Sequence, residues 1–206
     1  MTSKKASLQT LKQINILFIC LNISPSSGYS KFEQNKSFAH SFSYLLSQII
    51  KHSGTYHNCI RISQDNTRIL MVFKVDDKNT PFDLSYYLSI INKPITFVNQ
   101  TLQSNNISIL LQCSIAMDKG IAYINDHYLN YPLYKDYIWL ENYRSRTILL
   151  SNIAGRDKYP PLLITHSVYK SLDTSTKKTF SENYYYEHIC CYGQNPSINP
   201  IKKSIV

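Results

Sequence analysis

The chain has 206 residues, of which 43% are hydrophobic and 17% are charged. This composition is typical of one globular domain with a sizeable core, and it excludes an intrinsically disordered chain. Lysine and arginine number 22 against 13 for aspartate and glutamate, so the formal net charge is +9. A basic balance suits nucleic acid or a phosphorylated small molecule, but basic residues spread along the chain also fit a solvated surface.

The N-terminal residues and the number of cysteines indicate the cellular compartment of the protein. Residues 1–13 are polar and basic without a signal-peptide core, and no apolar run reaches the length of a membrane span. The five cysteines are an odd number, which favours a reducing compartment. We therefore expect a cytoplasmic protein with no membrane partner: a lead-in over 1–13, one domain over 14–195 and a loose tail over 196–206.

The first half of the chain predicts a strand, a helix and a hairpin. Ile14–Ile23 is continuously apolar and rich in β-branched residues, as in a buried central strand. Lys31–His52 has apolar residues near helical spacing. Tyr56–Ser63 and Arg68–Val75 are two further strands, and the turn residues Gln64–Asn66 between them indicate a hairpin.

A second long helix is predicted over Phe82–Leu102, with Pro94 expected to kink or interrupt it. Ile107–Asn125 is expected to form two strands that meet at a turn over residues 118–120, Asp-Lys-Gly. Leu140–Ala154 has a nearly helical apolar period, and Gly155 follows it as a C-terminal cap.

Two strand-like segments complete the chain, Leu162–Ile164 after two prolines and Tyr185–Tyr192 near the end. The order β-α-β-β-α-β predicts an α/β sandwich with a ferredoxin-like core. Its central sheet is antiparallel, and both long helices cover one face. Such a fold hosts many functions, so it does not by itself assign one.

Several short motifs in the second half add a family resemblance. Residues 163–172 read Leu-Ile-Thr-His-Ser-Val-Tyr-Lys-Ser-Leu, and Tyr184–Tyr186 and Cys191–Gly193 follow near the end. In order and spacing over residues 14–195 the chain resembles a class III nucleotidyl cyclase domain, in particular the small bacterial cyclases of the Pycsar antiphage type. The resemblance implies a nucleoside triphosphate ligand, Mg²⁺ or Mn²⁺ in an active enzyme, and a site formed across a dimer.

The resemblance also implies where the metal ligands stand. In the family one aspartate ends the first strand, and Asn22-Ile23 occupies that place here. A second aspartate belongs to the hairpin, where Asp65 is the candidate, although it is equally an ordinary turn residue. Asparagine keeps a carbonyl oxygen but no charge, which weakens a site for hard divalent cations.

The family carries an asparagine and, four residues later, an arginine on its last main helix. Aligned on the helix that follows Trp139, these positions fall at Ser145 and Leu149, neither of which can stabilise a phosphate charge. Arg144 and Arg146 are nearby cations at a different spacing, and Arg156 is a third. The candidate catalytic residues are Ser145, Arg144 and Arg146, and for the arginines a surface position on an amphipathic helix is the simpler interpretation.

Three functions remain open. The first is a catalytically degenerate cyclase-fold subunit that binds a nucleotide or pairs with a cyclase-like chain as a homodimer or heterodimer. The second is an active, divergent cyclase that makes a 3′,5′-cyclic nucleotide. The third is a basic nucleic-acid-binding module. It is disfavoured because Ile14–Ile23 and Arg68–Val75 lack alternating aromatic and basic residues.

Overall fold

The computed structural model describes residues 11–25, 32–53, 58–75, 82–105, 110–125, 137–139, 143–180 and 182–194. The predicted tail, most of the predicted lead-in and several loops lie outside these residues. The elements in chain order are β1 Leu11–Pro25, α1 Phe32–Ser53, β2 Cys59–Asp65, β3 Arg68–Lys74, α2 Leu84–Ser104, β4 Leu111–Asn125, β5 Tyr137–Trp139, α3 Tyr143–Ile153, β6 Leu162–Thr165, α4 His166–Ser171, α5 Thr174–Lys177, β7 Glu182–Tyr186 and β8 Ile189–Gln194.

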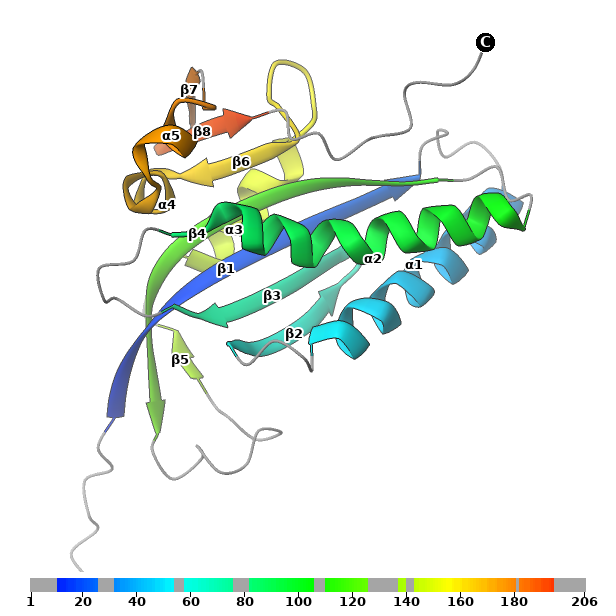
Figure 1. Ribbon diagram of the computed structural model, residues 1–206, viewed down its shortest axis with the longest axis horizontal. Helices are drawn as coiled ribbons and strands as arrows, with labels where there is room; N and C mark the ends of the chain where they lie inside the picture. The colour runs from blue at the N-terminus through cyan, green and yellow to red at the C-terminus, as the bar shows by residue number, and fades with distance from the viewer. Residues whose placement is uncertain are drawn as a thin grey trace, which may run out of the picture.

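All described strands belong to one eight-stranded sheet with the order β2-β3-β1-β4-β6-β8-β7, and β5 pairs with β4 (Figure 1). The pairs β2–β3, β1–β3 and β1–β4 are antiparallel, whereas β4–β6 is parallel. The first four strands therefore have the order of a split βαβ domain. The predicted ferredoxin-like core is confirmed, and α1 and α2 lie together on one face of it (Figure 1).

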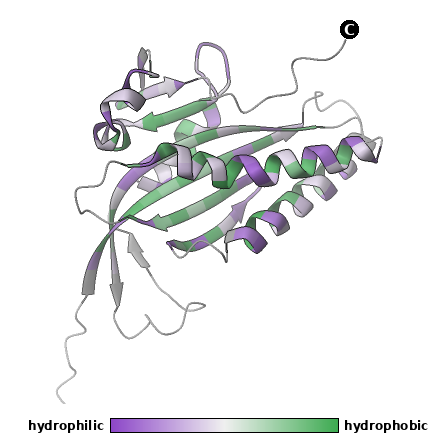
Figure 2. Cartoon of the chain, in the orientation of Figure 1, coloured by the Kyte–Doolittle hydropathy of each residue, from purple (hydrophilic) through white to green (hydrophobic). Residues whose placement is uncertain are grey.

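Strand β1 is buried on both faces, which explains its continuous apolar sequence. Leu17, Ile19 and Leu21 belong to the core cluster shared with α1 and α2. Ile16 and Phe18 belong to a separate cluster on the other face, where α3 also packs against β1 and β4. Figure 2 shows the central strands mostly green, while α1 and α2 alternate between purple and green along their length. The amphipathic pattern of the helices thus matches burial on one side.

The predicted hairpin at residues 118–120 is wrong, because β4 runs unbroken from Leu111 to Asn125. Asp118 is completely buried and accepts hydrogen bonds from side chains on α3, β6 and α4. Gly120 provides space rather than a turn: a Cβ atom there would lie 2.5 Å from the Tyr143 ring. Both turn-type residues are therefore used for packing within a long strand.

Pro94 does not interrupt α2, which continues from Leu84 to Ser104. The proline cannot donate a backbone hydrogen bond, but it is itself buried, as are Ile90, Ile91 and Ile95 around it. Burial of this apolar face outweighs the lost bond. The expectation of an interrupted helix is corrected accordingly.

The last predicted strand, Tyr185–Tyr192, is also wrong as a single element. The chain turns at Glu187 and His188, and β7 and β8 pair as an antiparallel hairpin. Glu187 has a φ of 52°, a left-handed conformation that no glycine marks in the sequence. The tyrosine-rich sequence was predicted as one continuous strand because Glu187 and His188 are not typical turn residues.

Several boundaries differ from the prediction, while the helix end is confirmed. Strand β1 begins at Leu11, so residues 11–13 extend the strand rather than the lead-in. Helix α3 ends where expected, and Gly155 follows with a φ of 75°. Among the described helices, none combines the length and the hydropathy needed to cross a bilayer.

Candidate functional site

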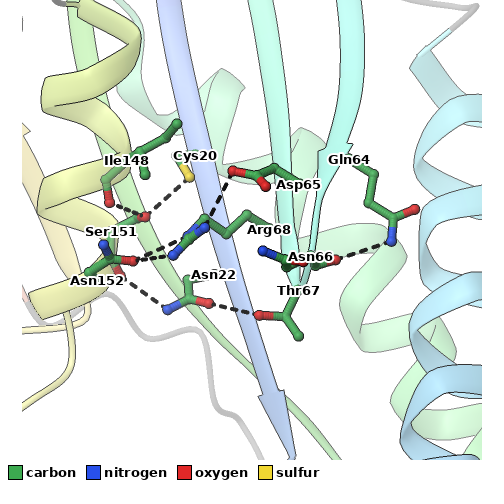
Figure 3. Close-up of polar contacts among 10 residues, drawn as sticks. All are labelled: Cys20, Asn22, Gln64, Asp65, Asn66, Thr67, Arg68, Ile148, Ser151 and Asn152. Carbon is green, nitrogen blue, oxygen red and sulfur yellow. Dashed lines mark hydrogen bonds and ion pairs between the residues drawn. The ribbon is translucent and has the colours of Figure 1, made fainter.

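The predicted metal position lies at one end of the β2–β3 hairpin, next to β1 and α3 (Figure 3). Asn22 pairs in register with Arg68 across β1 and β3, and Asp65 pairs with the same Arg68 across the hairpin. The structure therefore brings Asn22 and Asp65 into one neighbourhood. Ile23 faces the opposite side of β1, where it is 1% exposed in the helix-side core.

Arg68 occupies the centre of this neighbourhood (Figure 3). Its Nη1 lies 3.3 Å from Oδ2 of Asp65 in an ion pair. Its Nε and Nη2 donate to Oδ1 of Asn152 on α3, at 3.1 and 2.8 Å. One guanidinium thus neutralises the only carboxylate of the predicted metal site and ties the hairpin to α3.

The nitrogen and the oxygen of the Asn22 side-chain amide both form hydrogen bonds. Its Nδ2 donates to the carbonyl oxygen of Ser151 at 3.3 Å, and its Oδ1 accepts from Oγ1 of Thr67 at 3.4 Å. Beside it, Sγ of Cys20 donates to Oγ of Ser151 at 3.2 Å. Burial raises the pKa of the Cys20 thiol to about 11, so this sulfur is neutral near pH 7.

The donor set does not fit a centre for two divalent cations. Such a centre needs anionic oxygen ligands, and here the single carboxylate of Asp65 already has a cationic partner. The described residues contain no group of three or more histidine, cysteine, aspartate or glutamate side chains placed to hold a metal ion. Polar side chains and an arginine fill the space instead.

Two of the predicted catalytic residues, Ser145 and Arg146, line a different cavity of about 580 Å³ together with Leu149. This pocket lies between α3, the junction of β6 and α4, and the turn between β7 and β8. Its buried polar centre is Asp118, which is 0% exposed. Sequence reasoning missed this residue because Asp-Lys-Gly is typical of a turn.

The Asp118 carboxylate is saturated by donors. Oδ1 accepts from Oγ1 of Thr165 at 2.7 Å and from Oγ of Ser167 at 2.9 Å. Oδ2 accepts from Nε of Arg146 at 2.9 Å and from Nη2 of the same residue at 2.8 Å. The guanidinium also lies 4.8 Å from the centre of the Tyr143 ring. Arg146 is therefore fixed in place and compensated by a buried anion.

Arg144 lies apart from the other two candidates. It lines a smaller pocket of about 230 Å³ together with Phe18 of β1 and Arg61 and Gln64 of β2. Arg144 and Arg61 are both exposed, so this surface is basic. The structure thus unites Asn22 with Asp65 and Ser145 with Arg146, but it does not join the two pairs in one pocket.

No family model and no curated protein sequence matches the chain. Solved structures do match. The adenylyl cyclase CyaB from P. aeruginosa superposes with a TM-score of 0.58 at 12% identity, covering 89% of this chain and 95% of that one. The chain has the fold of a class III nucleotidyl cyclase catalytic domain.

Further cyclases give the same result. The guanylyl cyclase Cya2 superposes with a TM-score of 0.55 at 11% identity, covering 89% of this chain and 92% of that one. An adenylate cyclase from Trypanosoma brucei gives 0.52 at 11% identity, covering 90% and 92%. The ferredoxin-like core with its added helix and strands thus spans the cyclase fold nearly end to end, and the identities are too low to transfer an activity.

Proposed function

We propose that this cyclase-fold chain forms no catalytic metal centre of its own and acts as a nucleotide-binding or dimer-partner subunit. The observation that carries the proposal is the Arg68 guanidinium, which bridges Asp65 and Asn152 where a cyclase would need cations. The resemblance to Pycsar-type cyclases adds an antiphage setting to the proposal. An adjacent gene for a cyclic-nucleotide-sensing effector, or for a second and intact cyclase, would support that setting.

The reason is electrostatic. Divalent cations beside a triphosphate need anionic ligands, whereas Asn22 offers a neutral oxygen and Asp65 is paired with a fixed positive charge. On α3, Ser145 and Leu149 provide no guanidinium for the developing phosphate charge. The loss of one such donor typically costs about a hundredfold or more in rate. Several losses together leave a rate near background unless a partner chain supplies the missing groups.

A partner chain is part of the proposal. Phe18 and Arg61 of the sheet and Arg144 of α3 line a pocket. The resemblance implies a two-chain assembly in which the sheet face near Asn22 and Asp65 meets the other chain's helix over Trp139–Ala154. A second copy or an intact cyclase-like chain is the proposed occupant. The second candidate, an active divergent cyclase, has no support from the donor set around Asn22.

An activity assay tests the proposal. The purified protein is incubated with each of the four nucleoside triphosphates and with Mg²⁺ or Mn²⁺, and 3′,5′-cyclic monophosphates are sought by mass spectrometry. We expect product no higher than in a reaction without protein. Robust turnover by the protein alone would favour the active cyclase. A salt-dependent gel shift with arbitrary RNA or DNA would instead favour the nucleic-acid-binding alternative.

A further inference from the structure

A cavity of about 530 Å³ lies away from both regions described above, between the first half of α2, the α5 segment and the end of β8. Its polar lining comes from seven residues in three separate parts of the sequence, one of which is Ser85 at the start of α2. Ser89 and Asn92 belong to α2, Gln194 ends β8, and Ser175, Thr176 and Thr179 belong to α5 and the residues after it. Nothing proposed above uses these residues.

Two amide oxygens at this cavity lack hydrogen-bond donors. Oδ1 of Asn92 and Oε1 of Gln194 are buried and have no hydrogen-bond partner among the residues that the structure describes. Buried acceptors without a donor are rare, since each costs free energy in the folded state. Both are side-chain oxygens of residues that line the same cavity. A donor inside the cavity would satisfy both.

Four of the five hydroxyl groups that line the cavity cannot be those donors, because each has one proton and that proton is already used. Oγ of Ser89 donates to the carbonyl oxygen of Tyr86 at 2.8 Å. Oγ1 of Thr179 donates to the carbonyl oxygen of Thr176 at 2.7 Å. The Thr176 hydroxyl donates to the carboxylate of Asp173, and so does the hydroxyl of Ser175. These four hydroxyls thus present only lone pairs to a ligand, and the fifth belongs to Ser85, an exposed residue at the start of α2.

Asp173 adds a negative charge behind this wall. Hydrogen bonds from the side chains of Ser175 and Thr176 hold the pKa of Asp173 well below its usual range, so the carboxylate stays ionised. Among the described residues, none that lines the cavity carries a charge of its own. The cavity therefore combines many acceptors, a nearby anion and no competing cation in its wall.

From this arrangement we infer that the cavity binds an organic ammonium ion, a ligand rich in hydrogen-bond donors with an aliphatic chain. Leu84 and Leu88 also line the cavity and provide apolar surface for that chain. A diol of the same length offers fewer donors and gains nothing from Asp173, and a dicarboxylate would meet acceptors only. The inference does not depend on the proposed function, because the cavity shares no residue with the Asn22–Asp65 region.

Isothermal titration of the full chain compares three probes of equal carbon number: 1,5-diaminopentane, 1,5-pentanediol and glutarate. We expect saturable binding of the diamine only. Asn92→Leu and Gln194→Leu each remove one unpaired oxygen and are expected to weaken diamine binding at least tenfold. Gln100→Leu is the matched control, since Gln100 is an exposed amide on the same helix and does not line the cavity.

A thermal melt without ligand accompanies each titration. Replacing an unpaired buried acceptor by an apolar group leaves the melting temperature unchanged or raises it, so the variants remain folded for the binding test. If Asn92→Leu alone fails to fold, Gln194→Leu carries the comparison. Glutarate binding in place of the diamine, no diamine binding by the wild type, or wild-type affinity for the diamine in both leucine variants would each overturn the inference.

Discussion

At the scale of single residues, Arg68 determines what the Asn22–Asp65 region can bind. Its guanidinium faces a carboxylate on one side and an amide oxygen of α3 on the other, so a fixed cation already occupies the position between them. The side chains of Arg68 and Asp65 are 23% and 35% exposed, and solvent therefore screens the pair. We therefore expect the pair to contribute little to stability, and under the proposed function its role is to exclude a second cation.

Asp118, by contrast, is expected to contribute strongly to stability, because it is fully buried and accepts hydrogen bonds from three side chains. Asp118→Ala is expected to lower the free energy of unfolding by about 3 kcal/mol, since it leaves Arg146 and two hydroxyls without their acceptor. Asp118→Asn keeps an oxygen for Thr165 and Ser167 and should cost less. Urea denaturation measures both, and a loss below about 1 kcal/mol for the alanine variant would contradict this role.

The residues around Asn22 were only partly predictable. The family resemblance, applied to the end of β1 and to the hairpin, was sufficient to place Asn22 and Asp65 together. Arg68 sits in the predicted hairpin, but its partner Asn152 is 84 residues away, and no local pattern links them. Asp118 was misinterpreted because its neighbours favour a turn, whereas its partners come from α3, β6 and α4. Side-chain partners that arise only from tertiary contacts leave no signal in a single sequence.

At the scale of elements, periodicity succeeded where one face of an element meets the core and failed where a single residue was decisive. The continuous apolar sequence of β1 and the helical period of α1 predicted their burial correctly. Pro94 was expected to kink or interrupt α2, but the helix continues through it, with buried neighbours on both sides. Gly120 was expected to be in a turn, but it lies in a strand because an aromatic ring needs the space.

The contact between Gly120 and Tyr143 is directly testable. Gly120→Ala places a methyl group against the Tyr143 ring and is expected to destabilise the protein by about 1–3 kcal/mol. Gly120→Ala combined with Tyr143→Ser should recover much of that loss, compared with Tyr143→Ser alone. Chemical denaturation of the three variants measures the coupling. Equal losses of stability from Gly120→Ala with and without the tyrosine would show that the glycine is needed for its backbone conformation and not for the space beside Tyr143.

Asn99 joins α2 to the start of β4 and provides a second test at this scale. Its Oδ1 accepts from the backbone nitrogen of Leu111 at 2.8 Å, and its Nδ2 donates to the carbonyl oxygen of the same residue at 3.0 Å. The register partner of Leu111 is Pro25, which has no N–H to donate. Asn99→Ala leaves two buried backbone groups unpaired, and we expect a loss of about 2–4 kcal/mol in urea denaturation. Exposed Gln100→Ala should cost almost nothing, and equal losses at the two positions would refute the role of Asn99.

At the scale of the whole molecule, the sheet has one face covered by two long helices and another face that α3 covers only in part. The basic pocket with Arg61 and Arg144 lies on the second face. The predicted dimer uses this face, so a change in the charge of this surface is expected to change the strength of the assembly. The fold itself was predictable because the order of strands and helices allows few topologies.

If the proposed dimer forms, light scattering at high protein concentration is expected to give the mass of two chains. Arg144→Glu reverses a charge on the proposed interface and is expected to weaken the assembly about tenfold or more. Lys93→Glu is a matched reversal at an exposed position on α2, on the other side of the sheet, and should leave the mass unchanged. A monomer at all concentrations, with no cyclase-like chain copurifying, would contradict the dimer.

The most direct test of the central claim is a titration of the wild-type protein with Mn²⁺, followed by electron paramagnetic resonance of the free ion. With Asp65 paired to Arg68 and a neutral Asn22, we expect no binding in the millimolar range. Asn22→Asp combined with Arg68→Ala restores a second carboxylate and removes the internal cation, so this variant should bind Mn²⁺. Arg61→Ala removes an exposed arginine outside the cluster and should behave as the wild type does. Wild-type binding of Mn²⁺ that Asp65→Ala abolishes would contradict the claim that this chain forms no metal centre of its own.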